Sequence, residues 1–299
     1  MAKETPFKDL IQPFKIEDLG LRGRLVRLGP TAEAILGPHN YPRAVAEMMG
    51  ETLTLTAMLA SALKFDGVFK FQAQGDGPLS LMVADMGNDG ALRGYARFDD
   101  AAIAALGDSR DAPVPRLIGQ GRMAVTVDHG PNSQQIQGIT EMAGPTLAAC
   151  AQTYFRQSEP LETVISLAST STRAAGLMIQ RLPPEEGAGR LEGRDLEDEW
   201  RRATALSASV TADELLDSAI LPGELLYRLF HEDGVRLFKT RPVRHSCRCS
   251  KGKVKATLAA FSRDDINSMA EDGRIAVTCE FCKSEYVFEG QSLTDLHPA

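Results

Sequence analysis

Alternation of apolar and polar residues predicts strands in the first half of the chain. Residues 21–28 alternate in this way, and residues 68–98 contain three further alternating runs. Successive side chains of a strand point to opposite faces of a sheet, so alternation is typical of a strand with one buried face. The runs within 68–98 are separated by the turn sequences Gly75-Asp-Gly-Pro78 and Asn88-Asp-Gly90. We therefore expect an antiparallel meander there.

Helical spacing of apolar residues completes the first part of the chain. It predicts helices over 42–64 and 147–157, and the pattern of 173–180 is also helix-like. Residues 122–140 are expected to form a second hairpin, and residues 1–20 a loose lead-in. Together these elements predict a mixed α and β domain.

Cys150 falls on the apolar face of the helix predicted over 147–157, together with Leu147, Tyr154 and Phe155. A nucleophilic cysteine needs a nearby basic partner that lowers its pKa, and the sequence shows none for Cys150. We therefore expect Cys150 to be buried in a core and chemically inert.

The composition changes sharply after Pro183-Pro184, which marks a domain boundary. Residues 185–217 hold ten acidic residues against four arginines, a net charge of −6. Helices are predicted over 196–206 and, behind the capping box Thr211-Ala-Asp-Glu214, up to residue 219. Short helices with so much like charge have little stability of their own. The segment is either a solvated connector or a segment that unfolds when its neighbour does.

The rest of the chain predicts a small module. An apolar helix over 221–230 leads into it, and Ser250 and Ser262 are expected to cap two further helices. Val254, Leu258 and Phe261 share a face of the first of these two helices. Residues 274–278 and 285–288 alternate like strands, so the C-x-x-C sequence between them is expected at the turn of a hairpin.

Four of the five cysteines lie in this module, within 36 residues, as a C-x-C and a C-x-x-C pair. Two such pairs can surround one tetrahedral ion, and we expect a structural zinc site. The predicted ligands are Cys247, Cys249, Cys279 and Cys282. Zinc would hold two sulfur atoms roughly 3.7 Å apart, whereas a disulfide needs about 2.05 Å. Metal and disulfide therefore exclude each other, and an oxidant that reaches the thiolates can release the ion.

The residues around the first pair leave several interpretations open. Residues 241–255 carry six cations and no acid, which favours reactive thiolates or simply offsets the −2 charge of a tetrathiolate zinc site. The same cations could contact nucleic acid, although no interleaved aromatic residues support this. His245 could replace a ligand, but four cysteines already complete the coordination, so an exposed or supporting histidine is favoured. Cysteine count alone would also allow an iron–sulfur site.

Composition limits which partners the protein can bind and which cellular compartment it is expected in. A chain of 299 residues, 43% of them hydrophobic, can bury one large core and a smaller one. A net charge of −7 argues against a general binder of nucleic acid or membrane surfaces. No signal peptide or membrane span is visible, and unpaired cysteines then indicate a reducing cytoplasm.

The cysteine module resembles that of the redox-regulated holdase chaperones, the thirty-three-kilodalton heat-shock protein family. The resemblance begins at Leu225-Leu-Tyr-Arg-Leu-Phe230 and runs through Cys247-x-Cys249-Ser-Lys251 to Val277-x-Cys279-Glu-Phe-Cys282. In the first domain it is carried by Gln74-Gly-Asp-Gly-Pro-Leu79, Leu92-Arg-Gly-Tyr95, Thr146-Leu-Ala-Ala-Cys150, Tyr154-Phe155 with Ser158-Glu159, and Gly176-Leu-Met-Ile-Gln180. Residues 183–219 and the first dozen residues match least.

The resemblance implies an α+β protein of three parts. These are an N-terminal chaperone core (1–182), an acidic helical linker (183–240) and a C-terminal redox-sensing zinc module (241–299). In the reduced state the four cysteines would hold one Zn²⁺ per chain and the chaperone would be inactive. Oxidation would form the disulfides Cys247–Cys249 and Cys279–Cys282, release zinc and destabilise the linker. The exposed apolar surface would then hold unfolded client proteins without ATP, usually as an oxidised homodimer.

We therefore expect an oxidant-activated holdase in the cytoplasm, and not an enzyme. A thiol-disulfide oxidoreductase that uses the C-x-x-C is an alternative, but it needs a thioredoxin-like βαβ frame around Cys279. A zinc-ribbon protein that binds nucleic acid is a second alternative. Turnover in insulin reduction would favour the first of these, and salt-dependent binding to RNA or DNA the second.

Overall fold

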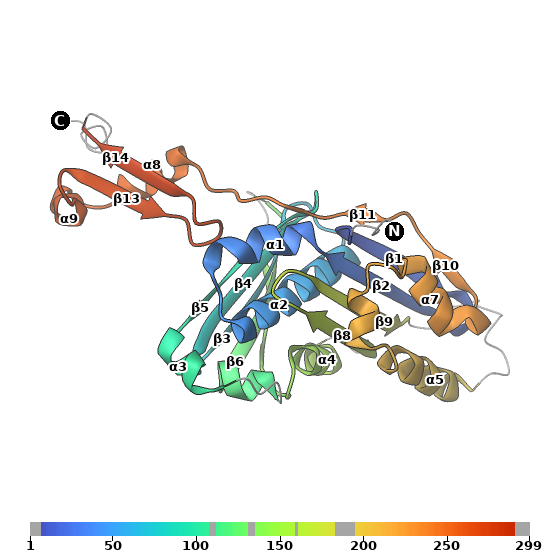
Figure 1. The fold of residues 1–299 in the computed structure, drawn as a ribbon. Coiled ribbons are helices and arrows are strands. Elements are labelled where there is room, and N and C mark those ends of the chain that lie inside the picture. The colour runs from blue at the N-terminus through green and yellow to red at the C-terminus, as the bar shows by residue number, and fades with distance from the viewer. Residues whose placement is uncertain (1–6, 108–111, 131–134, 159–160, 183–194, 291–299) are drawn as a thin grey trace, which may run out of the picture. The chain divides into compact units, whose positions relative to one another are not determined.

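The fold is described by a computed structural model over residues 7–107, 112–130, 135–158, 161–182 and 195–290. Its contacts divide the chain into two compact units, residues 1–245 and 246–299. Strands and helices alternate along the chain, so the predicted mixed α and β fold is confirmed (Figure 1). Among the described helices, none is both long and apolar enough to cross a membrane.

The first unit contains two six-stranded sheets. In the first sheet the order is β10-β1-β2-β9-β8, and β11 also pairs with β1. Its pairs are antiparallel throughout. The strands are β1 (Leu10–Ile16), β2 (Leu21–Leu28), β8 (Thr163–Ser169), β9 (Ala174–Arg181), β10 (Val235–Leu237) and β11 (Arg241–Pro242).

Two expectations for this sheet are wrong. Residues 173–180 form strand β9 and not a helix, because β9 lies between β2 and β8 and is buried on both faces. A strand buried on both faces loses its alternation and resembles a buried helix in sequence. The predicted lead-in contains β1, which pairs with β2 along its whole length. Pro13 makes this strand hard to predict from the sequence, because proline is unusual inside strands.

The second sheet has the order β12-β5-β4-β3-β6-β7. Antiparallel pairing of its middle strands confirms the predicted meander and the second hairpin. β12 pairs with β5 in parallel and forms one edge. The strands are β3 (Val68–Gly75), β4 (Leu79–Gly87), β5 (Ala91–Phe98), β6 (Gly121–Asp128), β7 (Ile136–Glu141) and β12 (Arg244–His245).

Helix α2 (Arg43–Ala62) runs between the two sheets and contacts both of them (Figure 1). It is buried on nearly all sides, including three threonines. The hydroxyls of Thr52, Thr54 and Thr56 each donate to the carbonyl oxygen four residues earlier, which satisfies them without a polar neighbour. Gly50 permits close packing on β8, since a Cβ there would lie 2.0 Å from Ser169 Oγ. The other helices of this part are α1 (Pro30–Leu36), α3 (Asp100–Ala105) and α4 (Leu147–Ser158).

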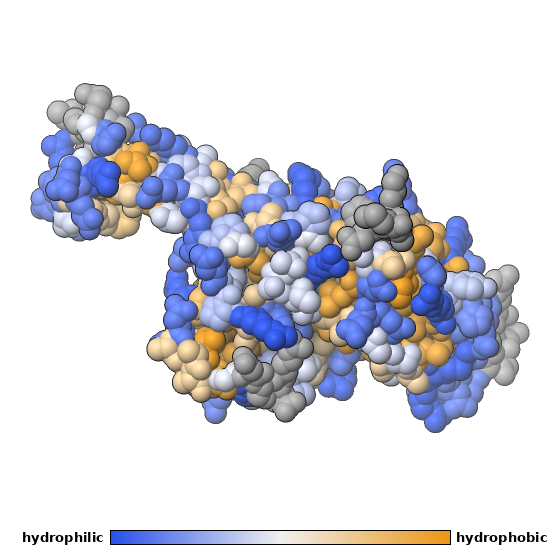
Figure 2. Space-filling view, in the orientation of Figure 1, coloured by the Kyte–Doolittle hydropathy of each residue, from blue (hydrophilic) through white to orange (hydrophobic). Residues whose placement is uncertain are grey.

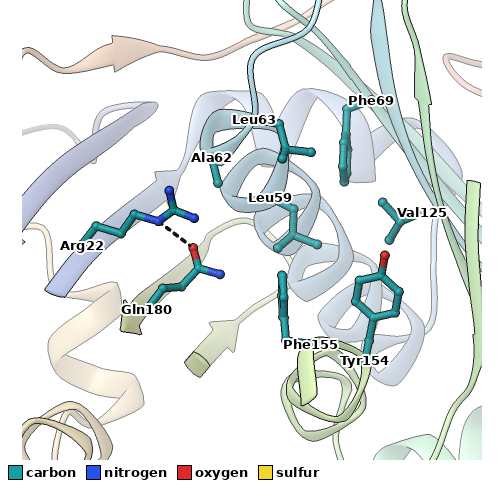
Figure 3. A pocket seen from close by; sticks show the side chains of 9 residues that line it. All are labelled: Arg22, Leu59, Ala62, Leu63, Phe69, Val125, Tyr154, Phe155 and Gln180. Atoms are coloured by element: carbon teal, nitrogen blue, oxygen red, sulfur yellow. Dashed lines mark hydrogen bonds between the residues drawn. The ribbon is translucent and has the colours of Figure 1, made fainter. Parts of the chain in front are cut away.

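A small cavity lies beside the end of α2. Its volume is about 40 Å³, and the side chains of Leu59, Phe69 and Phe155 are among those that line it. Arg22 Nε donates to Gln180 Oε1 over 3.2 Å at its border (Figure 3). Pockets for small molecules usually measure about 300–1,000 Å³. This cavity therefore has room for a few water molecules and is not a ligand site.

Three helices cover the other face of the first sheet: α5 (Leu196–Ala208), α6 (Ala212–Leu216) and α7 (Pro222–Phe230). The predicted helix over 196–206 and the capping box of Thr211 and Glu214 are confirmed, and Asp195 caps α5. The helix predicted up to residue 219 ends earlier, at Leu216, because Asp217 is extended. Pro183-Pro184, the predicted boundary, lies outside the described residues.

The second unit is small. It contains the hairpin of β13 (Arg274–Thr278) and β14 (Glu285–Glu289), preceded by α8 (Lys251–Leu258) and α9 (Arg263–Met269). Ser250 and Ser262 cap the two helices as predicted. Phe261 lies beyond the end of α8 and is 41% exposed, so the expectation that it shares a face of this helix with Val254 and Leu258 is wrong. The described core of this unit holds only four buried apolar residues, Leu258, Ile266, Ile275 and Phe288.

Candidate metal centre

The turn of the β13–β14 hairpin holds the second cysteine pair, as the sequence predicts. The strands pair from Arg274 with Glu289 up to Thr278 with Glu285, so the turn begins at Cys279. There the backbone N–H of Cys279 donates to the Ser284 carbonyl, and that of Lys283 to the Cys279 carbonyl, each over 2.9 Å. The turn is therefore closed by its own backbone.

The first cysteine pair lies in the segment between β12 and α8, which is neither helix nor strand. Ser250 ends this segment, because its side chain accepts a hydrogen bond of 3.3 Å from the N–H of Lys253 and starts α8. The Nζ of Lys253 also donates to the carbonyl of Arg248 over 2.8 Å.

The four cysteines come together. Their Sγ atoms all lie within 4.8 Å of one another, and none of the four is joined in a disulfide. The Sγ atoms of Cys247 and Cys279 are 3.8 Å apart, and those of Cys249 and Cys282 are 3.4 Å apart. Zinc–sulfur bonds of about 2.3 Å in a tetrahedron require sulfur atoms about 3.7 Å apart. The donor set and its spacing therefore fit one tetrahedral metal ion.

Burial and hydrogen bonds separate the pKa values of these thiols. Burial raises the pKa of Cys249 to about 12 and also raises that of Cys279. Burial opposes the ionisation of Cys282 too, but hydrogen bonds with Ser284, Cys249 and Cys247 together outweigh it and lower the pKa of Cys282 to about 7. Four crowded thiolates repel one another, and a bound cation would remove that penalty.

Tyr286 of β14 is a neighbour of the cysteines that the sequence analysis missed. Its hydroxyl donates to Cys249 Sγ over 3.0 Å. This hydrogen bond raises the pKa of Tyr286 to about 12, so the hydroxyl stays protonated and remains a donor. In sequence, Tyr286 is only one of the alternating residues of a strand, and no pattern marks it as a partner of sulfur.

Comparisons with known proteins show which family this chain belongs to. The family model described as Hsp33 protein matches residues 9–289. The 33 kDa chaperonin of Caulobacter vibrioides (strain NA1000 / CB15N) is 40% identical over 288 residues, which are 93% of this chain and 94% of the relative. The chain belongs to the Hsp33 family. The 33 kDa chaperonin of Nitrosococcus oceani is 37% identical, over 97% of this chain and 94% of the relative.

A solved Hsp33-family structure supports the fold. The 33 kDa chaperonin of Thermotoga maritima superposes with a TM-score of 0.80 and covers 96% of this chain and 97% of its own. The two sequences are 21% identical, so this likeness bears on the fold alone.

The other candidate residues of this Hsp33-family chain belong to the first unit. Cys150 is fully buried in α4, so its expected place in the core is confirmed, and burial raises the pKa of its thiol to about 11. His245 belongs to β12 of the first unit, opposite Leu92 of β5. Among the described residues, the group that could hold a metal contains the four cysteines and no histidine.

In this Hsp33-family member, α5, α6 and α7 bury an apolar sheet face. Phe14 of β1 stacks on Phe230 of α7, with ring centroids 6.2 Å apart. Trp200 of α5 packs against the same cluster and is half-buried. The buried sheet residues include Phe14, Ile16, Leu21, Leu25, Leu177 and Ile179, and the buried helix residues include Ala203, Leu215, Leu225, Leu226 and Phe230.

Two groups of ion pairs hold α5 in place. Arg181 of β9 binds Glu197 at the start of α5 over 2.7 Å, and it also binds Glu162 over 2.6 Å. Further along α5, Arg202 pairs with Asp233, whose side chain is 2% exposed. The described part of the acidic segment is therefore packed on the first sheet. Arg181 links α5 to that sheet, whereas Arg202 links α5 to Asp233, just after α7.

Proposed function

We propose that this protein is a redox-regulated chaperone, a holdase that binds unfolding proteins without ATP and keeps them from aggregating. The observation that carries the proposal is the cluster of four Sγ atoms within 4.8 Å of one another in a chain of the Hsp33 family. Relatives of 34–40% identity are named 33 kDa chaperonin.

In the reduced state, Cys247, Cys249, Cys279 and Cys282 would bind one Zn²⁺ per chain. Thiolate ligands in a tetrahedral arrangement select zinc over the harder cations, which prefer oxygen ligands. The ion would supply folding free energy to a unit whose described core contains only four buried apolar residues. The zinc-bound module is the resting, inactive state.

Oxidation would form the disulfides Cys247–Cys249 and Cys279–Cys282, as the family resemblance implies. Each disulfide forms when two thiols lose two protons and two electrons to the oxidant, and zinc then leaves. All four Sγ atoms lie within 4.8 Å of one another, so each sulfur has its motif partner within reach. A disulfide needs a sulfur–sulfur distance of about 2.05 Å, so closing either pair destroys the tetrahedral spacing that fits the ion.

The acidic linker, residues 183–240, would transmit this change to the core, residues 1–182. Its described helices bury the apolar face that Phe14, Leu25 and Leu177 present. When the zinc module, residues 241–299, unfolds, the linker would leave this face and clients would bind there. The active form would be an oxidised homodimer in the cytoplasm.

A chaperone role makes an enzymatic role unnecessary. The described residues around Cys279 form a β-hairpin, whereas a thiol-disulfide oxidoreductase of the thioredoxin type needs a βαβ frame. Turnover in insulin reduction would instead support a thiol-disulfide oxidoreductase. Salt-dependent binding to RNA or DNA would support a nucleic-acid-binding role.

Zinc and free thiols measured on one sample, before and after peroxide with mild heat, test the proposal. We expect release of one zinc per chain, loss of four thiols, and suppression of citrate synthase aggregation only after oxidation. The proposal fails if the reduced protein binds no metal through these cysteines, or if it protects citrate synthase equally well before and after oxidation.

A further inference from the structure

Residues 235–245 cross the edges of both sheets of the first unit, and we call them the strap. Within the strap, β10 and β11 pair with β1 of the first sheet, and β12 pairs with β5 of the second. Without the strap, β1 and β5 would each have an unpaired edge.

The strap is held largely through its backbone. The N–H of Phe238 donates to the Pro13 carbonyl over 3.0 Å, and the N–H of Arg244 to the Gly90 carbonyl over 3.0 Å. Gln12 Nε2 donates to the Phe238 carbonyl over 2.7 Å. At Gly90 the two chains lie so close that an added Cβ would be 2.5 Å from the Pro242 oxygen. Both edges therefore fit an extended backbone.

The side chains of the strap contribute little to its attachment to the two sheets. Leu237 and Phe238 are 44% and 40% exposed, and Val243 is the buried strap residue. The pair of Arg236 with Glu17 joins exposed side chains, and such pairs contribute little to stability. Arg244 is the exception, because its Nη1 donates to the Asp89 carbonyl over 2.6 Å in addition to its exposed pair with the Asp89 carboxylate. Figure 2 shows apolar and hydrophilic surface mixed on the face of the molecule that it presents. A segment with few buried contacts opens more readily than the core.

Unpaired strand edges bind extended chains. Their free N–H and C=O groups form a template for another strand, and the hydrogen bonds do not depend on the sequence of the incoming chain. A holdase must bind unfolding proteins of unrelated sequence, and these expose extended segments. Main-chain pairing at an edge meets that need better than a pocket shaped for particular side chains.

We propose that the edges of β1 and β5 bind extended segments of unfolded protein and that the strap occupies both edges until it is displaced. This inference rests on the proposed chaperone function and names a surface for it. The strap ends at His245, two residues before Cys247. Unfolding of the cysteine module removes the ordered neighbour at this end, so the strap frays from there.

Hydrogen exchange of backbone amides tests the proposal, with reduced carboxymethylated α-lactalbumin as a permanently unfolded client. Oxidation is expected to speed exchange in residues 235–245. Added client is expected to slow exchange at the edges of β1 and β5 while the strap amides stay fast. The proposal is wrong if the strap stays protected after oxidation or if saturating client leaves both edges unprotected.

A second copy of the chain could also pair with a free edge. Edge protection that appears without client and rises with protein concentration would assign the edges to self-association and overturn the proposal. If the oxidised protein suppresses aggregation but the edges gain no protection from client, only this inference fails. If it does not suppress aggregation at all, the proposed function fails.

A peptide pair tests the hydrogen bonds themselves. One ten-residue peptide alternates valine and lysine, and its twin carries N-methyl groups on alternate amides, which removes the donors along one edge. We expect the oxidised protein to bind the unmodified peptide at least tenfold more tightly. Equal affinity would show that clients bind through side chains alone and would overturn the proposal.

Arg244→Ala loosens the strap without touching the cysteines. The pair of Arg228 and Glu224 on α7 is similarly exposed, so Arg228→Ala is the matched control. We expect the oxidised Arg244→Ala protein to bind the unmodified peptide several-fold more tightly than the oxidised Arg228→Ala protein, with equal zinc content before oxidation. The same affinity in both variants would contradict a strap that competes with clients.

Discussion

Arg27 of β2 donates a hydrogen bond of 2.6 Å from Nη1 to the carbonyl oxygen of Ile220, which lies between α6 and α7. Its Nη2 donates to the Glu214 carbonyl over 3.2 Å. The side chain is 3% exposed, and its guanidinium also lies over the Phe7 ring, 5.2 Å from the centroid. A buried cation with carbonyl partners on the acidic segment fastens that segment to the sheet.

Arg27→Ala should therefore weaken the docking of α6 and α7. Hydrogen bonds from a charged donor are each worth about 1.5–3 kcal/mol, and the regained hydration of the arginine offsets part of this. We expect a loss of about 2 kcal/mol in urea unfolding followed by Trp200 emission. The control is Arg201→Ala, whose pair with Asp198 is exposed. Equal midpoints in the two variants would rule out a fastening role for Arg27.

Oxidation should shift the emission of Trp200 to the red. Trp200 is the one tryptophan of the chain and packs on the apolar cluster between α5 and the first sheet. If the acidic segment leaves the sheet, the indole becomes hydrated. Fluorescence recorded alongside zinc release checks this. Zinc release with unchanged emission would show that α5 stays docked and would remove it from the mechanism.

Serine substitutions should distinguish the four clustered cysteines, which are proposed to sense oxidants, from the buried Cys150. Cys150→Ser should keep the zinc content and the oxidant response, because Cys150 is buried in the first unit and burial raises the pKa of its thiol. Cys279→Ser removes one of the four clustered sulfurs and should lose both properties. Zinc assays and citrate synthase aggregation on both variants provide the measurement. The reverse outcome would mean that the sensor is wrongly assigned.

Glu51 should make stability fall as pH rises. Burial in α2, together with the charge of Glu47, raises the pKa of Glu51 from its ordinary value of 4.5 to about 7. The native state then binds a proton more tightly than the unfolded state, so this contribution is full below about pH 4.5 and is lost as pH approaches 7. The loss is at most about 3 kcal/mol.

Glu51→Gln should abolish this fall and be more stable than the parent at pH 8. Urea unfolding at pH 5.5 and 8 measures the difference. Glu33→Gln, on an exposed position of α1, is the control and should keep the fall. A parent protein whose stability does not change over this range would contradict the raised pKa.

Chelation of the reduced protein should unfold the second unit and leave the first folded. The four buried apolar residues described in that unit make a core too small to keep it folded without the ion. EDTA should expose Lys251, Lys253 and Lys255 of α8 to trypsin, and added zinc should reverse this. Cleavage at Lys70 of β3 is the control and should not change. Unchanged resistance of α8 would show that the unit folds without metal.

Most elements and the cysteine site followed from local patterns. The C-x-x-C sequence between two alternating runs predicted a hairpin turn, and Ser250 and Thr211 predicted helix starts, because these signals act within a few residues. Strand β9 was missed because burial on both faces erased its alternation. The partnership of Tyr286 with Cys249 was missed because it joins residues on different elements.

The sequence by itself determined which atoms can bind metal and which segments form helices and hairpins, since spacing and capping are local properties. Only the tertiary structure decided that Arg27 reaches the carbonyl of Ile220 and that the strap closes two sheet edges. These contacts join residues far apart in the chain. Their partners are chosen by the packing of the whole first unit, which no local pattern encodes.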